Sequence, residues 1–259
     1  MLRRLVRPLR RRWNETWWPL ASRIGYQPDR LANGLTVGAV LLSYRRQHNI
    51  DPILASLLRG RLIDKVILSN DDPSTSIGDF VSHTDERLTI IDQAENRGPG
   101  VRWRLAHEML ADVDIVVCVD DDLFLYPRQI ERLCGFVAAS PGTPHGVAGI
   151  RDREIVQRKE SPVDVLWRAY AVTREHVERY VEIVSGMHEH RDDVERLADD
   201  VVISLVGDAP AQVHDVGYLL SCRSQTDPDI AVHQRPHFHE TRRAVRAAAQ
   251  QVRSQTSWG

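Results

Sequence analysis

The sequence predicts an α/β fold with a mostly parallel sheet, helices on both faces and a basic N-terminal extension. One observation is the apolar run Ile115–Val119, which lies between aspartates and is typical of a strand buried on both faces. A second is that strand and helix patterns alternate before this run, the order that builds parallel sheets. A third is that polar loops follow the apolar strands, where open α/β folds bind their ligands.

The expected elements follow from the spacing of apolar residues and from turn residues. Four strands are expected in the first half, at Leu35–Leu42, Lys65–Ser69, Leu88–Ile91 and Ile115–Val119. The helices expected there are Asp51–Arg61, Val101–Ala111 and Pro127–Ala139, the last with proline in its first turn. The half after Ser140 is less regular, and the elements expected in it are a strand at Val147–Ile150 and helices at Ala198–Val206 and Glu240–Val252.

The composition is ordinary for a soluble globular protein. The chain has 259 residues, of which 42% are apolar and 27% charged, and its formal net charge is −2. Nothing in this balance predicts a nucleic-acid partner. Three cysteines are too few for a disulfide framework, so a reducing, cytoplasmic compartment is expected.

Residues 1–34 are expected to form an extension that precedes the main domain. Six of the first twelve residues are arginine, and Trp13, Trp17 and Trp18 follow them. Apolar residues recur between the arginines at helical spacing, which suits a helix lying peripherally in an anionic membrane surface with its tryptophans at headgroup depth. A disordered or protein-docking basic tail is the open alternative, and no apolar run reaches the roughly 20 residues of a spanning helix.

Three consecutive carboxylates, Asp120, Asp121 and Asp122, directly follow the central apolar run. Side chains alternate along a strand, so Asp120 and Asp122 point the same way and Asp121 the other. Two carboxylates on one side can hold a hard divalent cation, and that cation can bind a diphosphate. A solvated acidic turn that caps the next helix is the alternative, although a cap needs one aspartate rather than three.

Three strand-end loops are expected to converge on one crevice. Besides the triplet they are Ser43–Arg46 after the first strand and Asn70–Asp72 after the second. Together they offer an aromatic face and a guanidinium for a base, and carboxylates for ribose hydroxyls and a metal ion. No Gly-x-Gly-x-x-Gly follows the first strand, and no Gly-x-x-x-x-Gly-Lys-Ser/Thr occurs. A metal ion would therefore have to carry the diphosphate.

The order of these pieces resembles GT-A glycosyltransferases, most closely the exostosin-like glycosyltransferase family 64, with family 2 as the near alternative. The matching pieces are Ser43–Arg46, Asn70–Asp72, Asn96–Gly98, Asp120–Leu123, Asp199–Ser204 and a His/Arg-rich tail. The resemblance implies a GT-A-like (Rossmann-like) domain over residues 35–242, with a nucleotide-binding half at 35–139 and an acceptor half at 140–242. A C-terminal helix and tail would occupy 243–259.

The resemblance also implies an activity. It is a metal-dependent hexosyl- or N-acetylhexosaminyl-transferase that uses a nucleoside-diphosphate sugar, usually UDP-linked, with Mn²⁺ or Mg²⁺ bound through Asp122. The basic N-terminal segment adds a lipid-linked acceptor to the glycan acceptors of such enzymes. The donor-binding candidates are Tyr44, Arg45, Asp71, Arg97, Arg104, Asp120 and Asp121, together with Arg235 or Arg242, which would meet the diphosphate from a loop folding over the donor.

Asp199 and Asp200 stand at the start of an apolar helical pattern. An acidic pair at a helix N-terminus complements the helix dipole, and this structural role is one interpretation. In the resembling enzymes an acidic pair at this place faces the reacting carbon of the sugar, so both residues are catalytic candidates. A family 64 likeness implies retention of configuration, with one aspartate stabilising the developing charge. A family 2 likeness makes the same aspartate the general base of an inverting reaction, and both outcomes stay open.

Three histidines, His233, His237 and His239, lie within seven residues. No cysteine is near them and Pro236 interrupts any helix, which disfavours a structural zinc site. We expect a loop that folds over the donor, with His237 and His239 as candidates for a further metal ligand. A solvated basic loop is the alternative.

Two other functions compete with glycosyl transfer. A sugar nucleotidyltransferase shares the sheet and the metal, but it needs a glycine-rich loop after the first strand, which Ser43–Asn49 is not. A catalytically degenerate nucleotide-sugar binder or membrane-docked scaffold would keep the fold without turnover.

Overall fold

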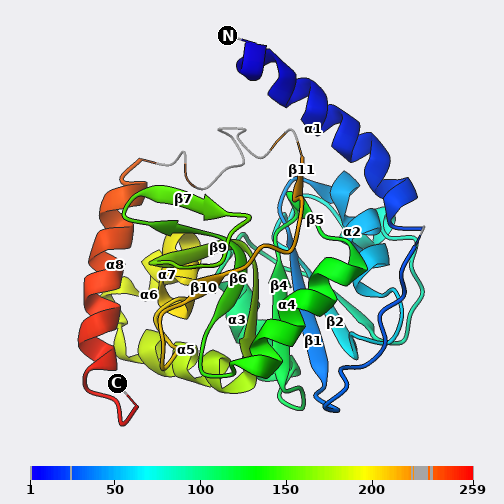
Figure 1. Cartoon of the computed structure of the whole chain (residues 1–259). Coiled ribbons are helices and arrows are strands. Elements are labelled where there is room, and N and C mark those ends of the chain that lie inside the picture. Colours follow the sequence, from blue (N-terminus) through cyan, green and yellow to red (C-terminus); the bar gives the residue numbers. More distant parts are fainter. Residues whose placement is uncertain (1, 24, 223, 225–232, 234–235, 259) are drawn as a thin grey trace.

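The computed structural model describes residues 2–23, 25–222, 224, 233 and 236–258, with side chains from residue 12 onward. Its described strands form a nine-stranded sheet and a separate two-stranded ribbon (Figure 1). The parallel part of the sheet runs in the order β3-β2-β1-β4 and comprises β1 (Val37–Ser43), β2 (Lys65–Asn70), β3 (Leu88–Asp92) and β4 (Ile115–Val119).

The second half of the chain completes the sheet. Strand β9 (Val165–Thr173) pairs antiparallel with β4, and beyond it follow β6 (His145–Arg151), β7 (Glu154–Gln157), β8 (Ser161–Pro162) and β10 (Gln212–Val213). The two-stranded ribbon consists of β5 (Leu123–Phe124) and β11 (Leu220–Ser221). The sheet is thus mixed and mostly parallel in its first half.

Helices cover both faces of this sheet. The described helices are α1 (Leu2–Ala21), α2 (Ile50–Leu57), α3 (Val101–Met109), α4 (Pro127–Ala139), α5 (Arg174–Gly186), α6 (Arg191–Asp193), α7 (Asp199–Ile203) and α8 (Phe238–Arg253). Short 3₁₀ turns occupy Gln47–Asn49, Ile77–Phe80 and His188–His190, and one π-helical turn, Val194–Ala198, leads into α7.

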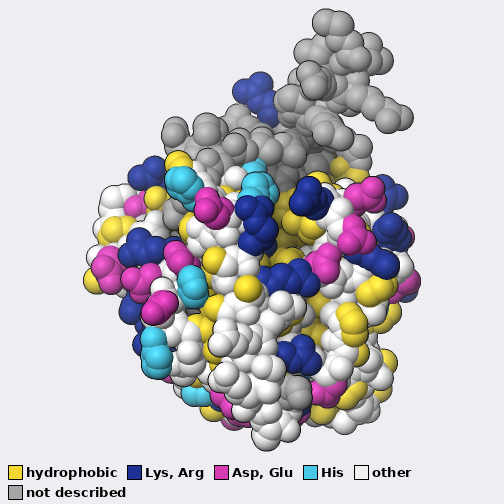
Figure 2. Space-filling model, turned by 90° about the vertical axis from the view of Figure 1, so that its left-hand side faces the viewer, with side chains coloured by type: hydrophobic (Ala, Val, Ile, Leu, Met, Phe, Trp, Pro, Cys, Tyr) yellow, Lys and Arg dark blue, Asp and Glu magenta, His cyan; other side chains and the backbone are white. Residues whose placement is uncertain are grey.

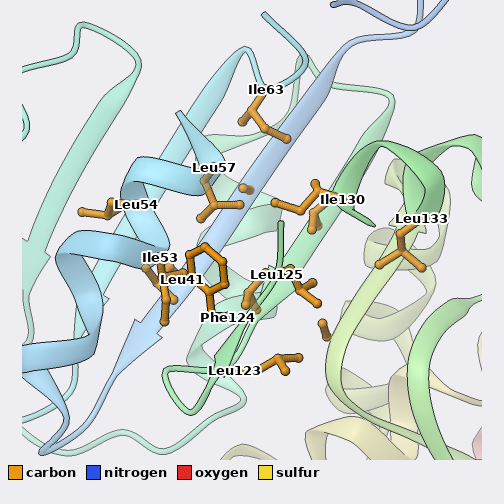
Figure 3. Packing of buried hydrophobic residues seen from close by; sticks show 14 of the residues in the cluster. Leu41, Ile53, Leu54, Leu57, Ile63, Leu123, Phe124, Leu125, Ile130 and Leu133 are labelled. Carbon is orange, nitrogen blue, oxygen red and sulfur yellow. The ribbon is translucent and has the colours of Figure 1, made fainter. Parts of the chain in front are cut away.

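Alternation along the strands divides the core between the two faces. In β4, Ile115 and Val117 pack with α2 and α4 on one face, whereas Val116 and Cys118 pack with α3, α5 and α8 on the other. Figure 3 shows the first of these clusters, in which Phe124 lies among leucines and isoleucines of α2, α4 and β1. Burial on both faces explains why the parallel strands are continuous apolar runs.

Most elements of the first half agree with the sequence. The four expected strands form within two residues of their predicted bounds, and the helix Pro127–Ala139 has the predicted ends. Beyond residue 140 the structure contains several elements that were not expected, and the longest of them are β9 and α5. Strand β9 was missed because Arg168 interrupts its apolar run.

Helix α1 is part extension and part core element. Its N-terminal half projects beyond the rest of the molecule (Figure 1), and its last turns pack on the domain. The Trp18 side chain is 1% exposed and stacks on Phe124 with ring centroids 5.6 Å apart. The expectation that Trp18 inserts into a membrane is therefore wrong, because this indole belongs to the core. Among the described residues, no helix combines the length and apolar character needed to cross a bilayer.

Replacing Trp18 by alanine should lower the free energy of unfolding by about 3–5 kcal/mol, because it empties a fully buried indole site. Trp13, which is 72% exposed in the same helix, provides the matched control, and Trp13→Ala should leave stability nearly unchanged. Urea unfolding of both variants measures the difference. Equal effects would show that α1 does not dock on the domain in solution.

Candidate functional site

The acidic triplet lies at the carboxyl edge of the sheet, between β4 and β5. Backbone hydrogen bonds hold it on both sides: the Asp120 amide donates to the Arg168 carbonyl over 2.8 Å, and the Cys222 amide donates to the Asp122 carbonyl over 3.0 Å. The triplet is therefore fixed between strand β9 and the end of β11. This edge is where an open α/β sheet binds ligands.

Each aspartate of the triplet faces an arginine from a different element. Arg102 Nη1 of α3 lies 2.7 Å from Asp120, and Arg46 Nη1, after β1, lies 2.6 Å from Asp121. The third arginine is Arg168 of β9, whose Nε is 3.7 Å from Asp122 Oδ1. The first two pairs are at hydrogen-bond distance and the third is not.

Asp121 organises the loop that follows β1. Its carboxylate accepts hydrogen bonds from the Tyr44 amide at 2.8 Å and from Arg46, and its backbone carbonyl accepts one from Asn49 at 2.8 Å. Burial raises the pKa of the Asp121 carboxyl to about 6. The Asp121 side chain is only 7% exposed, and both of its oxygens bond to the protein, so its predicted contribution to donor binding would be indirect, through the loop that it holds.

In the loop after β1, Arg45 is exposed to solvent and Tyr44 is half-buried. The Arg45 guanidinium lies over the Tyr44 ring at 5.2 Å, which is a cation–π distance. Arg45 has a φ of 58°, a left-handed conformation that is uncommon outside glycine. The two side chains predicted to meet the base are therefore adjacent and accessible, while Asp121 holds the backbone beneath them.

Arg102 connects the triplet to the second acidic group. Its Nε lies 3.3 Å from Asp199 Oδ2, and its Nη1 reaches Asp120. The family resemblance predicts Arg97 and Arg104 near the donor and does not single out Arg102. Arg102 precedes the buried residues Leu105 and Ala106 by three and four positions, so it lies on the core side of α3. Arg104 lies on a different side of the helix and forms no ion pair among the described residues. The position of Arg102 on the apolar face of the predicted helix was the sequence feature that could have identified it.

Asp71 anchors the loop that contains Arg97. Its carboxylate accepts hydrogen bonds from the amides of Arg97 at 3.1 Å and Gly98 at 2.7 Å, and burial raises its pKa. Gly98 has a φ of +85°, and a Cβ at Gly100 would lie 2.6 Å from the Glu195 Cα. Glycine at both positions therefore lets this loop contact the π-helical turn that precedes α7.

The two members of the acidic pair have different surroundings. Asp199 is 3% exposed and accepts a hydrogen bond from Trp103 Nε1 at 3.0 Å, and burial raises its pKa. Asp200 is paired with Arg242 of α8, whose Nη1 and Nη2 lie 2.5 and 2.9 Å from its two oxygens. Asp199 is thus the more buried of the two carboxylates, and Asp200 is the more accessible.

The histidine cluster is spread along the approach to α8. His237 is exposed and lies 3.3 Å from Glu240, and His239 is exposed in the first turn of α8. His233 is partly exposed; burial lowers its pKa, while the negative charge of Asp122 acts in the opposite sense. The structure therefore brings His233, which the sequence analysis did not select as a ligand, into electrostatic range of Asp122. Arg235 lies outside the described residues.

A divalent cation fits the residues at Asp122. Its Oδ1 is buried and has no hydrogen-bond partner among the described residues, which leaves this carboxylate oxygen available to a ligand. Within the described ranges no three side chains of the metal-binding types converge on one point. Asp122 would therefore share the ion with groups that the ligand supplies, as is usual for Mg²⁺ on phosphates.

The surface beside the site carries both signs of charge. Figure 2, which views the molecule from the α8 side, shows basic, acidic and histidine side chains interspersed rather than separated into one patch. A cavity of about 720 Å³ lies at the amino ends of β2 and β3, at the opposite edge of the sheet. Its arginines, Arg30, Arg61 and Arg87, are paired with aspartates, so it offers less for an anionic ligand.

Comparisons with known proteins agree with this fold. Residues 39–181, more than half of the chain, match the family model described as Glycosyl transferase family 2. A crystal structure of GalNAc-T7 with UDP, GalNAc and Mn²⁺ has a TM-score of 0.52 and 8% sequence identity, and the match covers 77% of this chain and 48% of that chain. The chain thus spans about half the length of GalNAc-T7, and the likeness shows a GT-A-like fold.

A second structural match is the crystal structure of S. aureus TarS 1–349, with a TM-score of 0.49 and 13% identity, covering 84% of this chain and 69% of that chain. No curated protein sequence matches this chain. The matched family is the near alternative of the sequence analysis, and the more specific likeness to family 64 stays a prediction.

Proposed function

The chain belongs to glycosyl transferase family 2, and we propose that it transfers a sugar from a UDP-linked donor to an acceptor with the help of Mn²⁺ or Mg²⁺. The observation that carries the proposal is the acidic triplet at the carboxyl edge of the sheet, with the unpartnered Asp122 oxygen. The GalNAc-T7 structure of similar fold contains UDP, GalNAc and Mn²⁺, which supports the choice of donor and ion.

Donor binding divides among three strand ends. Asp122 would hold the cation, with His233, His237 or His239 as a further ligand, and the cation would neutralise the diphosphate as it departs. Tyr44 and Arg45 offer a ring and a guanidinium for the base. Asp71 shapes the adjoining loop through two backbone amides. The sugar that we propose is transferred is a hexosyl or N-acetylhexosaminyl group.

Asp200 is the proposed catalytic carboxylate. It stands at the start of α7, and Arg242 fixes its orientation through two hydrogen bonds. Each carboxylate oxygen has a second lone pair, so Asp200 can still accept the proton of an attacking hydroxyl. Family 2 membership favours this general-base role and an inverting reaction, and the retaining outcome implied by the family 64 resemblance is its competitor.

The acceptor side of the proposal rests on α1. Trp13, Trp17 and Leu20 are 72%, 41% and 45% exposed, and their spacing of four and three residues places them on one helix face. Six arginines among the first twelve residues supply the opposite charge to an anionic lipid surface. We propose that the protein lies peripherally on the cytoplasmic face of a membrane and acts on a lipid-linked acceptor. The three free, buried cysteines fit a reducing compartment.

Asp122→Ala should abolish the increase in UDP affinity that Mn²⁺ produces in the wild type, because it removes the carboxylate that holds the ion. Calorimetric titration of UDP with and without Mn²⁺ measures this. Asp112→Ala, an exposed aspartate paired with Lys65 at the other edge of the sheet, is the control and should behave as wild type. Undiminished Mn²⁺-dependent affinity in Asp122→Ala would remove the metal assignment.

Asp200→Asn should keep UDP affinity but slow sugar transfer by about 100-fold or more, the usual effect of removing a general base. Transfer or slow donor hydrolysis, followed by UDP release from a panel of sugar nucleotides, provides the assay, and the anomeric configuration of the product separates inversion from retention. If Asp199→Asn and Asp200→Asn both turned over at the wild-type rate, the pair would be a helix cap. Donor binding without turnover in the wild type would favour a degenerate binder.

The Trp13→Ala/Trp17→Ala double variant should lose co-sedimentation with anionic vesicles, since these exposed indoles supply the insertion. Wild-type binding should be stronger to anionic than to neutral vesicles and should weaken at high salt. Phe80→Ala/Ile155→Ala removes two other apolar side chains, which are 44% and 61% exposed, and is the control. Equal sedimentation of both double variants would remove the membrane anchor and leave a soluble acceptor as the default.

A further inference from the structure

Arg168 occupies an unusual backbone position in β9. Its φ is +76°, in the left-handed region that costs a residue other than glycine about 1–2 kcal/mol. The register between β6 and β9 shifts at this point, from Gly146 opposite Tyr170 to Ala148 opposite Trp167, so β9 carries a bulge. Bulges next to active sites re-aim a side chain. Here the bulge directs the long side chain of Arg168 toward the acidic triplet.

The side chain of Arg168 is 6% exposed and only partly satisfied. Its Nη2 donates to Ser221 Oγ over 2.6 Å, which ties it to β11. Its Nε lies 3.7 Å from Asp122 Oδ1, and neither atom has a hydrogen-bond partner in the described part of the chain. Buried charged atoms without a hydrogen bond are costly, and in native structures such atoms often bind an ion or water or serve a catalytic role.

The other ion pairs of the site are hydrogen-bonded. Asp120, Asp121 and Asp200 all lie within hydrogen-bond distance of an arginine. We call Asp122 and Arg168 the open pair: among the described residues they are the one oppositely charged pair at the triplet that is not within hydrogen-bond distance. A cation and a diphosphate that arrive together also have opposite charges, so each member of the open pair has a matching partner in the donor complex.

We propose that Arg168 exchanges partners when the donor binds: in the empty enzyme it is the counter-charge of Asp122, and in the loaded enzyme its Nε donates to a diphosphate oxygen while the cation takes Asp122. This inference rests on the proposed function. Arg168 therefore opposes binding of the cation alone and favours binding of the diphosphate. The backbone conformation of Arg168, with its positive φ, places the guanidinium where it can reach either Asp122 or the diphosphate.

Arg168→Gly tests the exchange without adding backbone strain, because glycine adopts a positive φ without steric cost. Without nucleotide, the affinity for Mn²⁺ should rise about tenfold; with Mn²⁺ saturating, the affinity for UDP should fall about tenfold, the weight of one charge-assisted hydrogen bond. Electron paramagnetic resonance of free Mn²⁺ and calorimetry of UDP provide the two affinities. Arg153→Gly, with a φ of 69° in the exposed turn between β6 and β7, is the matched control and should change neither.

The opposite signs of the two changes identify the role. A merely structural residue would weaken both affinities when replaced, and a spectator would change neither; either result overturns the proposal. Arg168→Lys, which keeps the charge, should restore weak binding of Mn²⁺ alone. A wild type that binds no UDP with Mn²⁺ would reject the proposed function itself, and the exchange with it. Normal wild-type binding with an unaltered glycine variant would reject only the exchange.

Discussion

Arg102 lies between Asp120 and Asp199 and joins the two halves of the chain through one buried guanidinium. It comes from α3, whereas its partners come from the end of β4 and the start of α7. Burial raises the pKa of both carboxyls, so each needs the nearby positive charge to remain ionised. Breaking a buried pair of this kind costs roughly 3–5 kcal/mol, because the remaining charge has no partner.

The same constraint shapes the loops around the site. Asp121 requires Arg46 and the Tyr44 amide, so the loop after β1 must turn toward the triplet. Asp71 requires the amides of Arg97 and Gly98, so the third loop must lie beside it. Buried carboxylates thus position the accessible groups, and the residues left for a ligand are those that the protein does not satisfy. Asp122 is the clearest of these.

The predictable parts of the fold are the strands and helices whose own residues show an uninterrupted apolar run or a clear helix start. The run Ile115–Val119 is apolar without interruption because it is buried on both faces, and Pro127 marks the start of α4. Strand β9 could not be read this way, because a bulge and Arg168 break its pattern. Trp18 could not be separated from Trp13 and Trp17 either, because its burial depends on Phe124, more than 100 residues away.

In the site, residue types were predictable and pairings were not. The triplet and the pair Asp199–Asp200 stand out as consecutive carboxylates in sequence, but the partners that distinguish Asp120, Asp121 and Asp122 come from three other elements. Arg102 and Arg168 became visible only when the helix and the strand bulge placed them. The role of each carboxylate therefore depends on which arginine lies beside it and on the distance between the two groups.

A crystal structure of the full chain with UDP and Mn²⁺ tests the central claim most directly. The account predicts that the ion binds Asp122 and the diphosphate, with the base beside Tyr44 and the sugar position facing Asp200. Nucleotide bound elsewhere, for example in the cavity lined by Arg30, Arg61 and Arg87 at the opposite edge of the sheet, would contradict it.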